Sequence, residues 1–432
     1  MLKKITSLFL AVAIAGTLAT GCGSKDNTSD STAQKSANAA PVVSNSTEIK
    51  GEITFSSHRT DLQNTILPQF VADFNKKYPN VKVNIETIKD YESAMKVKMS
   101  SNDVPDVWTV KNGYYTKDQL AKYNIPLDGY EFTKDFLYGD VFSGSDGKIY
   151  ALSQGANAVG VVYNKKIFAE LGISVPKTLD EMIAAGKKIT ASGRVGLGTS
   201  AKAGWPLQYY WMDIANTIAG DKNYRNTLAA KDAPFTADSP MVKAFTLLKT
   251  FKDAGILEKD PLSSDWEPIK KDFRDSKVGM MILGPWFIPQ ALDPLTLDDV
   301  GFFPLPYDNE NTTKKVSMGP DTGIGMAANT KNKAATEAFF KFMMDTNYAN
   351  IGKSLGLLTA RKSIAVDLPF AKEFESYNPQ KLDVGSDSKE LTDIMSKGQI
   401  DYNKLAQEIL VTGDVQKTFD QLNEKWKKAR GK

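Results

Sequence analysis

Residues 147–168 read Gly-Lys-Ile-Tyr-Ala-Leu-Ser-Gln-Gly-Ala-Asn-Ala-Val-Gly-Val-Val-Tyr-Asn-Lys-Lys-Ile-Phe. The β-branched and aromatic runs predict two short strands, 148–152 and 158–163, and the small residues between them allow the backbone to turn. Because a few such residues can absorb large changes in φ and ψ, the segment suits a chain that passes from one rigid unit to another. We therefore predict a hinge here, and two lobes that close on a ligand.

The N-terminus has the pattern of an export signal. Met-Leu-Lys-Lys precedes an apolar run over residues 5–19, and the run ends before Cys22. A membrane-crossing helix needs about 20 apolar residues, so residues 1–21 are predicted to be a secretory signal peptide. Cys22 is the single cysteine, which excludes a disulfide within the chain. Its position after the signal is similar to that of the lipid-acceptor cysteine of bacterial lipoproteins; the alternative is ordinary secretion with an incidental cysteine.

Residues 23–48 consist almost entirely of Ser, Thr, Ala, Asn, Asp, Gly and Lys, without apolar periodicity. Such a composition cannot bury enough apolar surface to fold. Residues 22–48 are therefore expected to be a flexible linker that carries an acyl chain such as palmitate at its start and spans about 30 Å on average. The rest of the chain would then lie at the extracytoplasmic face of the cell membrane.

The charge balance bears on the kind of partner. The formal net charge is +3, and removal of Lys3 and Lys4 with the signal peptide would leave +1. A nucleic-acid-binding protein usually carries a strong basic patch, whereas the basic residues here gather only at 425–430, where a helix terminus favours cations. We therefore expect no nucleic acid as a partner.

Strand and helix patterns alternate in residues 49–157. Short strands are expected at 52–55, 81–85 and 104–110, with helices between them, and this β-α-β-α-β order predicts a mostly parallel sheet. Ligands of such sheets bind beyond the carboxyl ends of the strands. The loops that follow the first and third strands, 58–61 and 111–114, are therefore candidate ligand-binding loops.

A second set of strands and helices follows the hinge. Thr178 and Glu181 form a capping box that opens a helix to about residue 190. Further expected elements are a helix over 239–255, strands at 278–283 and 300–304, a second Gly-rich crossing at 320–326, a helix over 333–344 and several helices after residue 348.

Several strings, taken in order, carry a resemblance to a known family. They are Glu-Ile-Thr-Phe with an Arg-Thr-Asp loop, Phe-Asn-Lys-Lys-Tyr-Pro-Asn-Val-Lys-Val, Asp-Val-Pro-Asp-Val, Gly-Lys-Ile-Tyr-Ala-Leu, Val-Tyr-Asn-Lys-Lys-Ile-Phe, Gly-Pro-Trp and Thr-Lys-Asn-Lys-Ala-Ala-Thr-Glu-Ala-Phe. Together they resemble the extracellular solute-binding proteins of ABC importers, in the carbohydrate-binding branch that includes maltose-binding protein. The resemblance implies an α/β fold of two lobes, each a mostly parallel sheet flanked by helices, with three hinge crossings near 155–160, 318–324 and 346–354.

The same resemblance implies a domain division and a function. The N-lobe would comprise residues 49–157 and 323–348, and the C-lobe residues 158–322 and 349–432. The protein would be a monomeric receptor without a cofactor, and not an enzyme. It would bind a sugar or oligosaccharide between its lobes and deliver it to the membrane permease subunits of an ABC importer.

The first-lobe candidates lie in the two strand-end loops. Arg59 and Asp61 suit sugar recognition because a guanidinium fork and a carboxylate can each engage two vicinal hydroxyls; the alternatives are a mutual surface ion pair or, for Asp61, a helix cap. His58 is the only histidine, and no motif supplies the partners of a zinc site or a Ser-His-Asp triad. It is expected either to line the ligand site or to sit in a surface loop. Asn112 and Tyr114 are the candidates of the other loop.

Tryptophans are the main second-lobe candidates. An indole ring beneath the apolar C–H face of a sugar buries area while the hydroxyls keep their hydrogen bonds. We expect Trp205 and Trp286 to face the ligand, and Trp108, inside a strand, to be core. The predicted ligand-binding set is completed by Trp211, Trp266, Asn157 and Asp321.

Two other functional readings stay open. A secreted lipoprotein glycosidase would need a pair of catalytic acids, and no spacing among the 51 acidic residues singles one out. The same fold could instead bind a polyamine, an iron complex or an anion.

Overall fold

The computed structural model describes residues 46–310, 312–383, 385 and 387–431. The predicted signal peptide, the predicted lipid acceptor Cys22 and nearly all of the predicted linker lie outside these residues. No helix in the described part of the chain is long and apolar enough to cross a membrane.

The first sheet has the strand order β2-β1-β3-β11-β4. Its strands are β1 (Gly51–Ser57), β2 (Val81–Thr87), β3 (Val107–Lys111), β11 (Thr322–Met326) and β4 (Leu152–Ser153). As predicted, β1 pairs in parallel with both β2 and β3, with α1 (Ile66–Lys77) and α2 (Tyr91–Ser100) in the crossovers. The two later strands join antiparallel. The parallel part therefore places the carboxyl ends of β1 and β3 at the same edge of the sheet.

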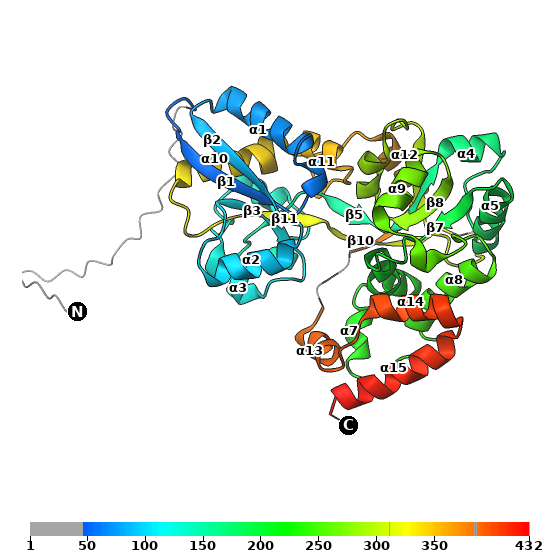
Figure 1. Ribbon diagram of the computed structural model, residues 1–432. Coiled ribbons are helices and arrows are strands. Elements are labelled where there is room, and N and C mark those ends of the chain that lie inside the picture. Colours follow the sequence, from blue (N-terminus) through cyan, green and yellow to red (C-terminus); the bar gives the residue numbers. More distant parts are fainter. Residues whose placement is uncertain (1–45, 311, 384, 386, 432) are drawn as a thin grey trace, which may run out of the picture. The chain divides into compact units, whose positions relative to one another are not determined.

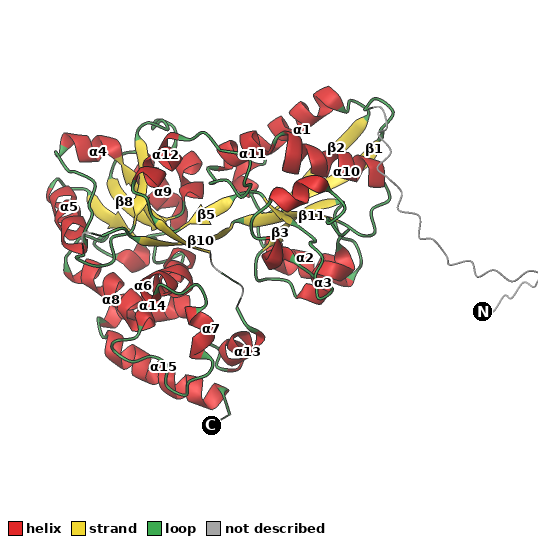
Figure 2. Ribbon diagram, turned by 180° about the vertical axis from the view of Figure 1, so that it is seen from behind, coloured by secondary structure: helices red, strands yellow, loops and turns green. Residues whose placement is uncertain are grey.

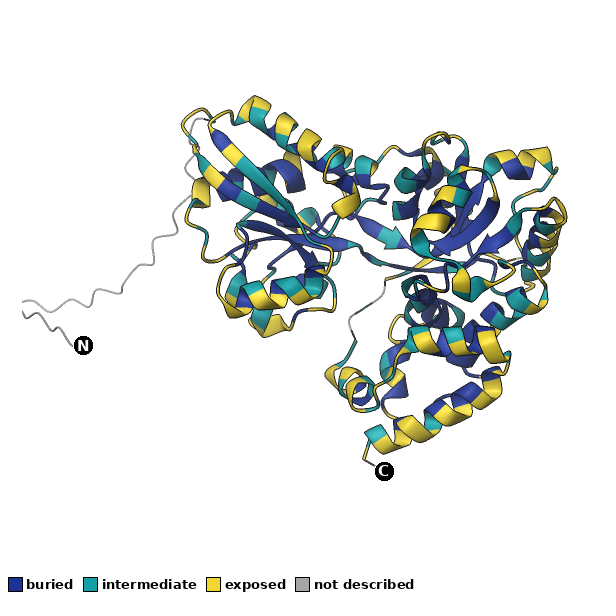
Figure 3. Cartoon of the chain, in the orientation of Figure 1, coloured by how far each residue is buried: buried dark blue, intermediate teal, exposed yellow. Residues whose placement is uncertain are grey.

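The second sheet has the order β7-β8-β6-β9. Its strands are β6 (Gly160–Asn164), β7 (Val195–Gly198), β8 (Val278–Leu283) and β9 (Val300–Pro304). Only β7 and β8 are parallel, because β6 runs antiparallel to both of its neighbours. The expectation of a mostly parallel sheet is therefore wrong for this lobe. All residues of β6, β8 and β9 are buried (Figure 3), and a strand buried on both faces reads as a continuous apolar run whatever the direction of its partner.

A short three-stranded sheet links the two larger ones. It contains β5 (Ala156–Ala158), β10 (Lys315–Pro320) and β12 (Gln380–Asp383), and β10 pairs antiparallel with β5 and parallel with β12. Figure 1 shows β5 and β10 running between the first and second sheets. Of the predicted strand at 148–152, only Leu152 lies in a strand, β4. After a bend at residues 154–155 the chain continues into β5 and β6.

Three passages of the chain connect the two main hydrophobic cores. Leu152 belongs to the first core and Ala156 to the second. Met318 of β10 packs in the second core, whereas Ile324 of β11 packs in the first. For the third passage, the resemblance implied a position at 346–354, but α11 (Tyr348–Leu355) packs in the first core and only Leu358 enters the second. The chain therefore first reaches the second core at Leu358, while Arg361 and Ile364 still contact the first lobe.

Helices cover both sheets. The predicted capping box is confirmed: the Thr178 hydroxyl accepts from the Glu181 amide, and the Glu181 carboxylate accepts from the Thr178 amide, at the start of α5 (Leu179–Ala191). A π-helical turn spans Tyr210–Ile214, and a second one, Phe342–Thr346, follows α10 (Lys333–Lys341). Other helices that pack with the second core are α4 (Lys165–Glu170), α6 (Ala215–Ala219), α7 (Tyr224–Leu228), α8 (Pro240–Asp253), α9 (Trp266–Arg274), α12 (Pro369–Ser376), α13 (Lys389–Lys397), α14 (Tyr402–Thr412) and α15 (Val415–Ala429) (Figure 2).

Candidate functional site

The loop after β1 holds a two-pronged ion pair. Arg59 Nε donates to Asp61 Oδ1 at 2.8 Å, and Arg59 Nη2 donates to Asp61 Oδ2 at 2.7 Å. The side chains are 14% and 32% exposed, so both keep some accessible surface. Asp61 lies inside the 3₁₀ turn Thr60–Leu62, which has no side-chain cap, so the helix-cap alternative is wrong. The ion-pair alternative describes the structure, and whether the pair also binds ligand stays a prediction.

Charge from the second lobe reaches this loop. Burial works against ionisation of Asp61, but the hydrogen bond and charge of Arg59, together with the charge of Lys270 on α9, hold the pKa of its carboxyl below the usual value. Lys270 is buried, pairs with Glu267 at 2.8 Å and lies 5.5 Å from the Trp266 ring centre. The charge of Lys270 on α9 therefore acts on the carboxylate of Asp61 in the first-lobe loop.

His58 is half-buried and neutral. Burial, reinforced by the positive charges of Lys111 and Arg59, lowers its pKa to about 3. Its ring contacts the ring of Tyr91 edge-on at 6.0 Å, and Nδ1 is buried without a hydrogen-bond partner among the described residues. No group of three or more His, Cys, Asp or Glu side chains in the described residues could hold a metal ion.

The loop after β3 contributes a more exposed surface. Tyr114 is 51% exposed, and Lys111 Nζ lies 5.6 Å from its ring centre. Lys111 also pairs with Glu92 of α2. Asn112 is half-buried beside them. Tyr114 and Tyr402 of α14 are close enough for the charge of one phenol to influence the other, which brings this loop near the second lobe as well.

Asp321 and Asn157 occupy two of the three crossings. Asp321 stands between β10 and β11; its amide donates to Gly155 O at 3.0 Å, and the Thr322 hydroxyl donates to Oδ2 at 3.1 Å. Burial raises the pKa of the Asp321 carboxyl, and the charges of Arg59 and Lys111 offset part of this rise. The two strand-end loops of the first lobe are therefore close to the second crossing.

Asn157 lies in β5, with Oδ1 buried and without a hydrogen-bond partner among the described residues. A Cβ at Gly284, the residue before Pro285 and Trp286, would collide with this oxygen. Glycine at the end of β8 therefore makes room for the amide.

Three tryptophans of the second lobe form a cluster, hereafter the tryptophan cluster: Trp205, Trp266 and Trp286. Their ring centres lie 4.7 Å (205 to 266), 5.6 Å (205 to 286) and 5.9 Å (266 to 286) apart. All three are half-buried, so each keeps part of its ring surface accessible. Trp205 and Trp286, both predicted to face the ligand, are thus brought together, and Trp266 joins them from α9.

Two other tryptophans lie in the cores. Trp108 is fully buried, as expected. Trp211 is 1% exposed and stacks on Tyr402 with ring centres 5.9 Å apart and planes 16° apart. A side chain this buried offers no surface to a ligand, so we do not carry Trp211 into the proposed site.

Tyr209 was missed by sequence reasoning. Trp286 Nε1 donates to its hydroxyl at 3.3 Å, and the phenol interacts with Asp213, Asp321 and Asn157. Burial, followed by the charge of Asp213, raises its pKa far above the usual value, so it stays protonated. Tyr209 stands in the aromatic run Trp-Pro-Leu-Gln-Tyr-Tyr-Trp and is itself 7% exposed, so the sequence does not distinguish it from the neighbouring core aromatics.

Comparison with known proteins agrees with this architecture. The model of the bacterial extracellular solute-binding protein family matches residues 60–349. The multiple sugar-binding protein of Streptococcus mutans is 25% identical over 308 residues, which cover 70% of this chain and 73% of that protein. The melibiose/raffinose/stachyose-binding protein of Bacillus subtilis is 20% identical over 337 residues, covering 76% and 78%.

Solved structures give the same result. The BlMnBP1 binding protein of an ABC transporter from Bifidobacterium animalis subsp. lactis, in complex with mannobiose, superposes with a TM-score of 0.74 at 25% identity and covers 90% of this chain and 96% of that one. The apo form of RafE from Streptococcus pneumoniae has a TM-score of 0.69 at 21% identity over 88% and 98% of the two chains, which supports the fold alone.

Proposed function

Since the chain belongs to the bacterial extracellular solute-binding protein family, we propose that it binds a sugar or oligosaccharide between its two lobes and acts as the receptor of an ABC importer. The relatives described above are named for sugars or sugar oligomers. They are named as binding proteins, which supports a receptor rather than a glycosidase.

The observation that carries the proposal is the tryptophan cluster. Three half-buried indole rings within 6 Å of one another offer flat apolar surface to the C–H faces of a sugar. Burial of that surface is worth about 25 cal/mol per Å². Hydrogen-bonding groups stand nearby: the Tyr209 hydroxyl beside Trp286, and Asn157 and Asp321 around that hydroxyl.

The pairing of charges favours a neutral ligand over an anion. Each cation near the site already has an acidic partner: Arg59 has Asp61, Lys111 has Glu92, and Lys270 has Glu267. An anion would have to compete with these carboxylates for the same donors. A neutral hydroxyl can accept from the remaining N–H groups without breaking the pairs.

A polyamine is the second candidate, and one observation favours it. Asp321 and Asp213 are half-buried carboxylates near Tyr209, and desolvation raises the pKa of both. An ammonium group would stabilise their ionised forms. The names of the relatives favour the sugar.

A thermal-shift screen tests the proposal. Residues 46–432 would be tested with mannobiose, mannotriose, raffinose, stachyose and spermidine, and with citrate as an anion control. A ligand at 100 times its Kd adds about 2.7 kcal/mol to the free energy of unfolding, which moves the midpoint by several degrees. We expect at least one sugar to raise the midpoint; a rise with spermidine alone would replace the sugar with the polyamine.

The membrane attachment belongs to the same proposal. We propose that Cys22 is acylated after removal of residues 1–21, so that the receptor stays beside its permease. The support is the position of the single cysteine after the apolar run. Incorporation of labelled palmitate tests it; a Cys22→Ser variant that remains equally membrane-bound would refute the anchor without affecting the sugar proposal.

A further inference from the structure

The geometry points to Asp213 as a ligand-binding carboxylate of the second lobe, placed beside the tryptophan cluster by a π-helical turn. This inference rests on the proposed function and deepens it. It assigns to the second lobe an acceptor for sugar hydroxyls, a role predicted from the sequence only for residues of the first lobe and the crossings.

The position of Asp213 follows from the local backbone. The turn Tyr210–Ile214 is π-helical, and such single turns are rare and frequent at functional sites. Asp213 follows Tyr209 by four residues, and the charge of its carboxylate acts on the Tyr209 phenol. Ser317 of β10, whose hydroxyl binds Asp213 Oδ1, lies two residues before Gly319, the partner of Asn157 in β5. The Tyr209 hydroxyl accepts a hydrogen bond from Trp286 Nε1 at 3.3 Å. Asp213 therefore lies beside the second crossing, one helical turn from the tyrosine that contacts the tryptophan cluster.

The carboxylate of Asp213 has unused hydrogen-bonding capacity. Ser317 of β10 donates its hydroxyl to Oδ1 at 3.0 Å, and this is its one hydrogen bond from a side chain in the described part of the chain. An ionised carboxylate can accept about four. Asp213 is half-buried, so the remaining lone pairs are not sealed inside the core.

The cation whose charge acts on Asp213 forms its ion pair with another carboxylate. Arg225 of α7 is buried and pairs through Nη2 with Asp387 Oδ1 at 2.8 Å. Asp213 forms no ion pair among the described residues. A structural carboxylate of this burial would need such a partner, because unpaired buried charge is costly.

The electrostatics agree with a functional role. Burial raises the pKa of Asp213 to about 6; Arg225 and the Ser317 hydrogen bond oppose the rise, and Asp387 adds to it. The folded protein thus binds more protons than the unfolded one between about pH 4 and 6, and this group makes folding less favourable as the pH rises through that range. At neutral pH the ionised side chain therefore lowers stability, as expected for a group retained for binding.

The test separates a binding role from a structural one. Asp213→Asn keeps the acceptor for Ser317 and removes the charge; Asp253→Asn, in an exposed ion pair with Lys249 on α8, is the matched control. Unfolding midpoints without ligand and Kd values for mannobiose, mannotriose, raffinose, stachyose and spermidine would be measured at pH 7.5. For Asp213→Asn we expect an equal or higher midpoint and a Kd for the bound sugar weaker by about 10- to 100-fold, the range for hydrogen bonds to charged groups.

Each other outcome has a distinct meaning. A lower midpoint with unchanged Kd would make Asp213 structural and overturn the inference while leaving the sugar receptor intact. An unchanged Kd with an equal or higher midpoint would also overturn the inference and leave the sugar receptor intact. If no sugar binds the parent protein, the proposed function fails, and the inference fails with it. Binding of spermidine alone, lost in Asp213→Asn, would overturn the sugar and keep a ligand-binding carboxylate.

Discussion

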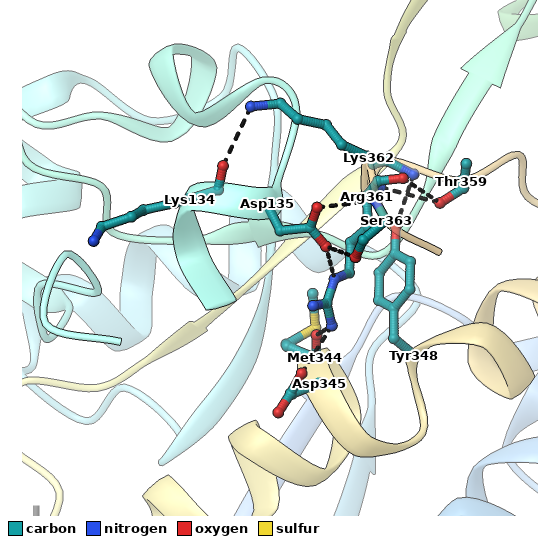
Figure 4. Close-up of polar contacts among 10 residues, drawn as sticks. Lys134, Asp135, Met344, Asp345, Tyr348, Thr359, Arg361, Lys362 and Ser363 are labelled. Carbon is teal, nitrogen blue, oxygen red and sulfur yellow. Dashed lines mark hydrogen bonds and ion pairs between the residues drawn. The ribbon is translucent and has the colours of Figure 1, made fainter. Parts of the chain in front are cut away.

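Arg361 and Asp135, 226 residues apart in the sequence, form an ion pair in which Arg361 Nε donates to Asp135 Oδ2 at 2.7 Å (Figure 4). Arg361 Nη1 also donates to Asp345 Oδ1 at 2.9 Å, and the guanidinium lies over the rings of Phe136 and Tyr348 at 5.3 and 5.8 Å. Arg361 follows the third passage between the cores. It therefore fastens the end of that passage to the first lobe.

Loss of this arginine should destabilise the protein strongly. The Arg361 side chain is only 7% exposed, and Arg361→Gln would leave Asp135 and Asp345 without their cation, at a cost of about 3 kcal/mol. Urea unfolding measures the change. Arg194→Gln is the control, because the Arg194–Glu170 pair is more exposed and should cost at most about 1 kcal/mol. Equal losses in the two variants would show that Arg361 is not a special anchor.

The paired residues Arg59 and Asp61 give a second prediction. Arg59→Ala and Asp61→Ala should each weaken sugar binding by about 1.5 to 3 kcal/mol, since each removes a charged partner of a ligand hydroxyl and leaves the other charge unpaired. Because the two side chains contact each other, the double variant should lose less than the sum of the single losses. Calorimetry with the sugar found in the screen measures all three. Parent-like affinity in every variant would reduce the pair to the mutual ion pair seen in the structure.

His58 should make the protein sensitive to acid. Its folded-state pKa of about 3 lies below the usual value of about 6.5, so the unfolded chain binds the proton more readily and stability is lost as the pH falls from about 6.5 towards 3. At pH 5 the loss from this group is about 2 kcal/mol. Between pH 7.5 and pH 5, the free energy of unfolding of the parent should fall by about 2 kcal/mol more than that of His58→Asn. Parallel pH profiles would contradict the buried, neutral histidine.

The strands that hold the first-lobe loops could be predicted from the sequence, because alternation and capping are local signals. The β-α-β order places Arg59 and Asn112 after neighbouring strands, and the electrostatic link of Arg59 and Lys111 to Asp321 agrees with it. Pairing directions in the second sheet could not be predicted, since fully buried strands carry no directional pattern.

The sequence also could not show which aromatic side chains reach the site and which pack in the core. Trp205 and Trp211 stand six positions apart in one aromatic run, yet one joins the tryptophan cluster and the other packs in the core. A π-helical turn begins between them and changes the helical register. Composition does not reveal this change of register, so Tyr209 and Asp213 could not be predicted as site residues.

Ligand binding should bring the two lobes closer together. The three passages between the cores are short, and the second contains Gly319 near the end of β10, so a few backbone angles could absorb a rotation. Small-angle scattering with a saturating sugar should give a smaller radius of gyration than without it. A sugar that causes no thermal shift serves as the control, and an unchanged radius with a bound sugar would remove closure from the mechanism.

The most direct test of the account is calorimetric titration of the sugar from the screen into the parent and a Trp205→Ala/Trp286→Ala variant. Loss of two stacking surfaces should weaken binding by at least about 100-fold, that is about 2.7 kcal/mol, and should abolish most of the ligand-induced change in tryptophan fluorescence. Trp108→Phe, in the core of the first lobe, controls for the loss of an indole. We expect one-to-one binding by the parent and by Trp108→Phe, and little or none by the folded double variant; parent-like affinity in that variant would contradict a sugar site at the tryptophan cluster.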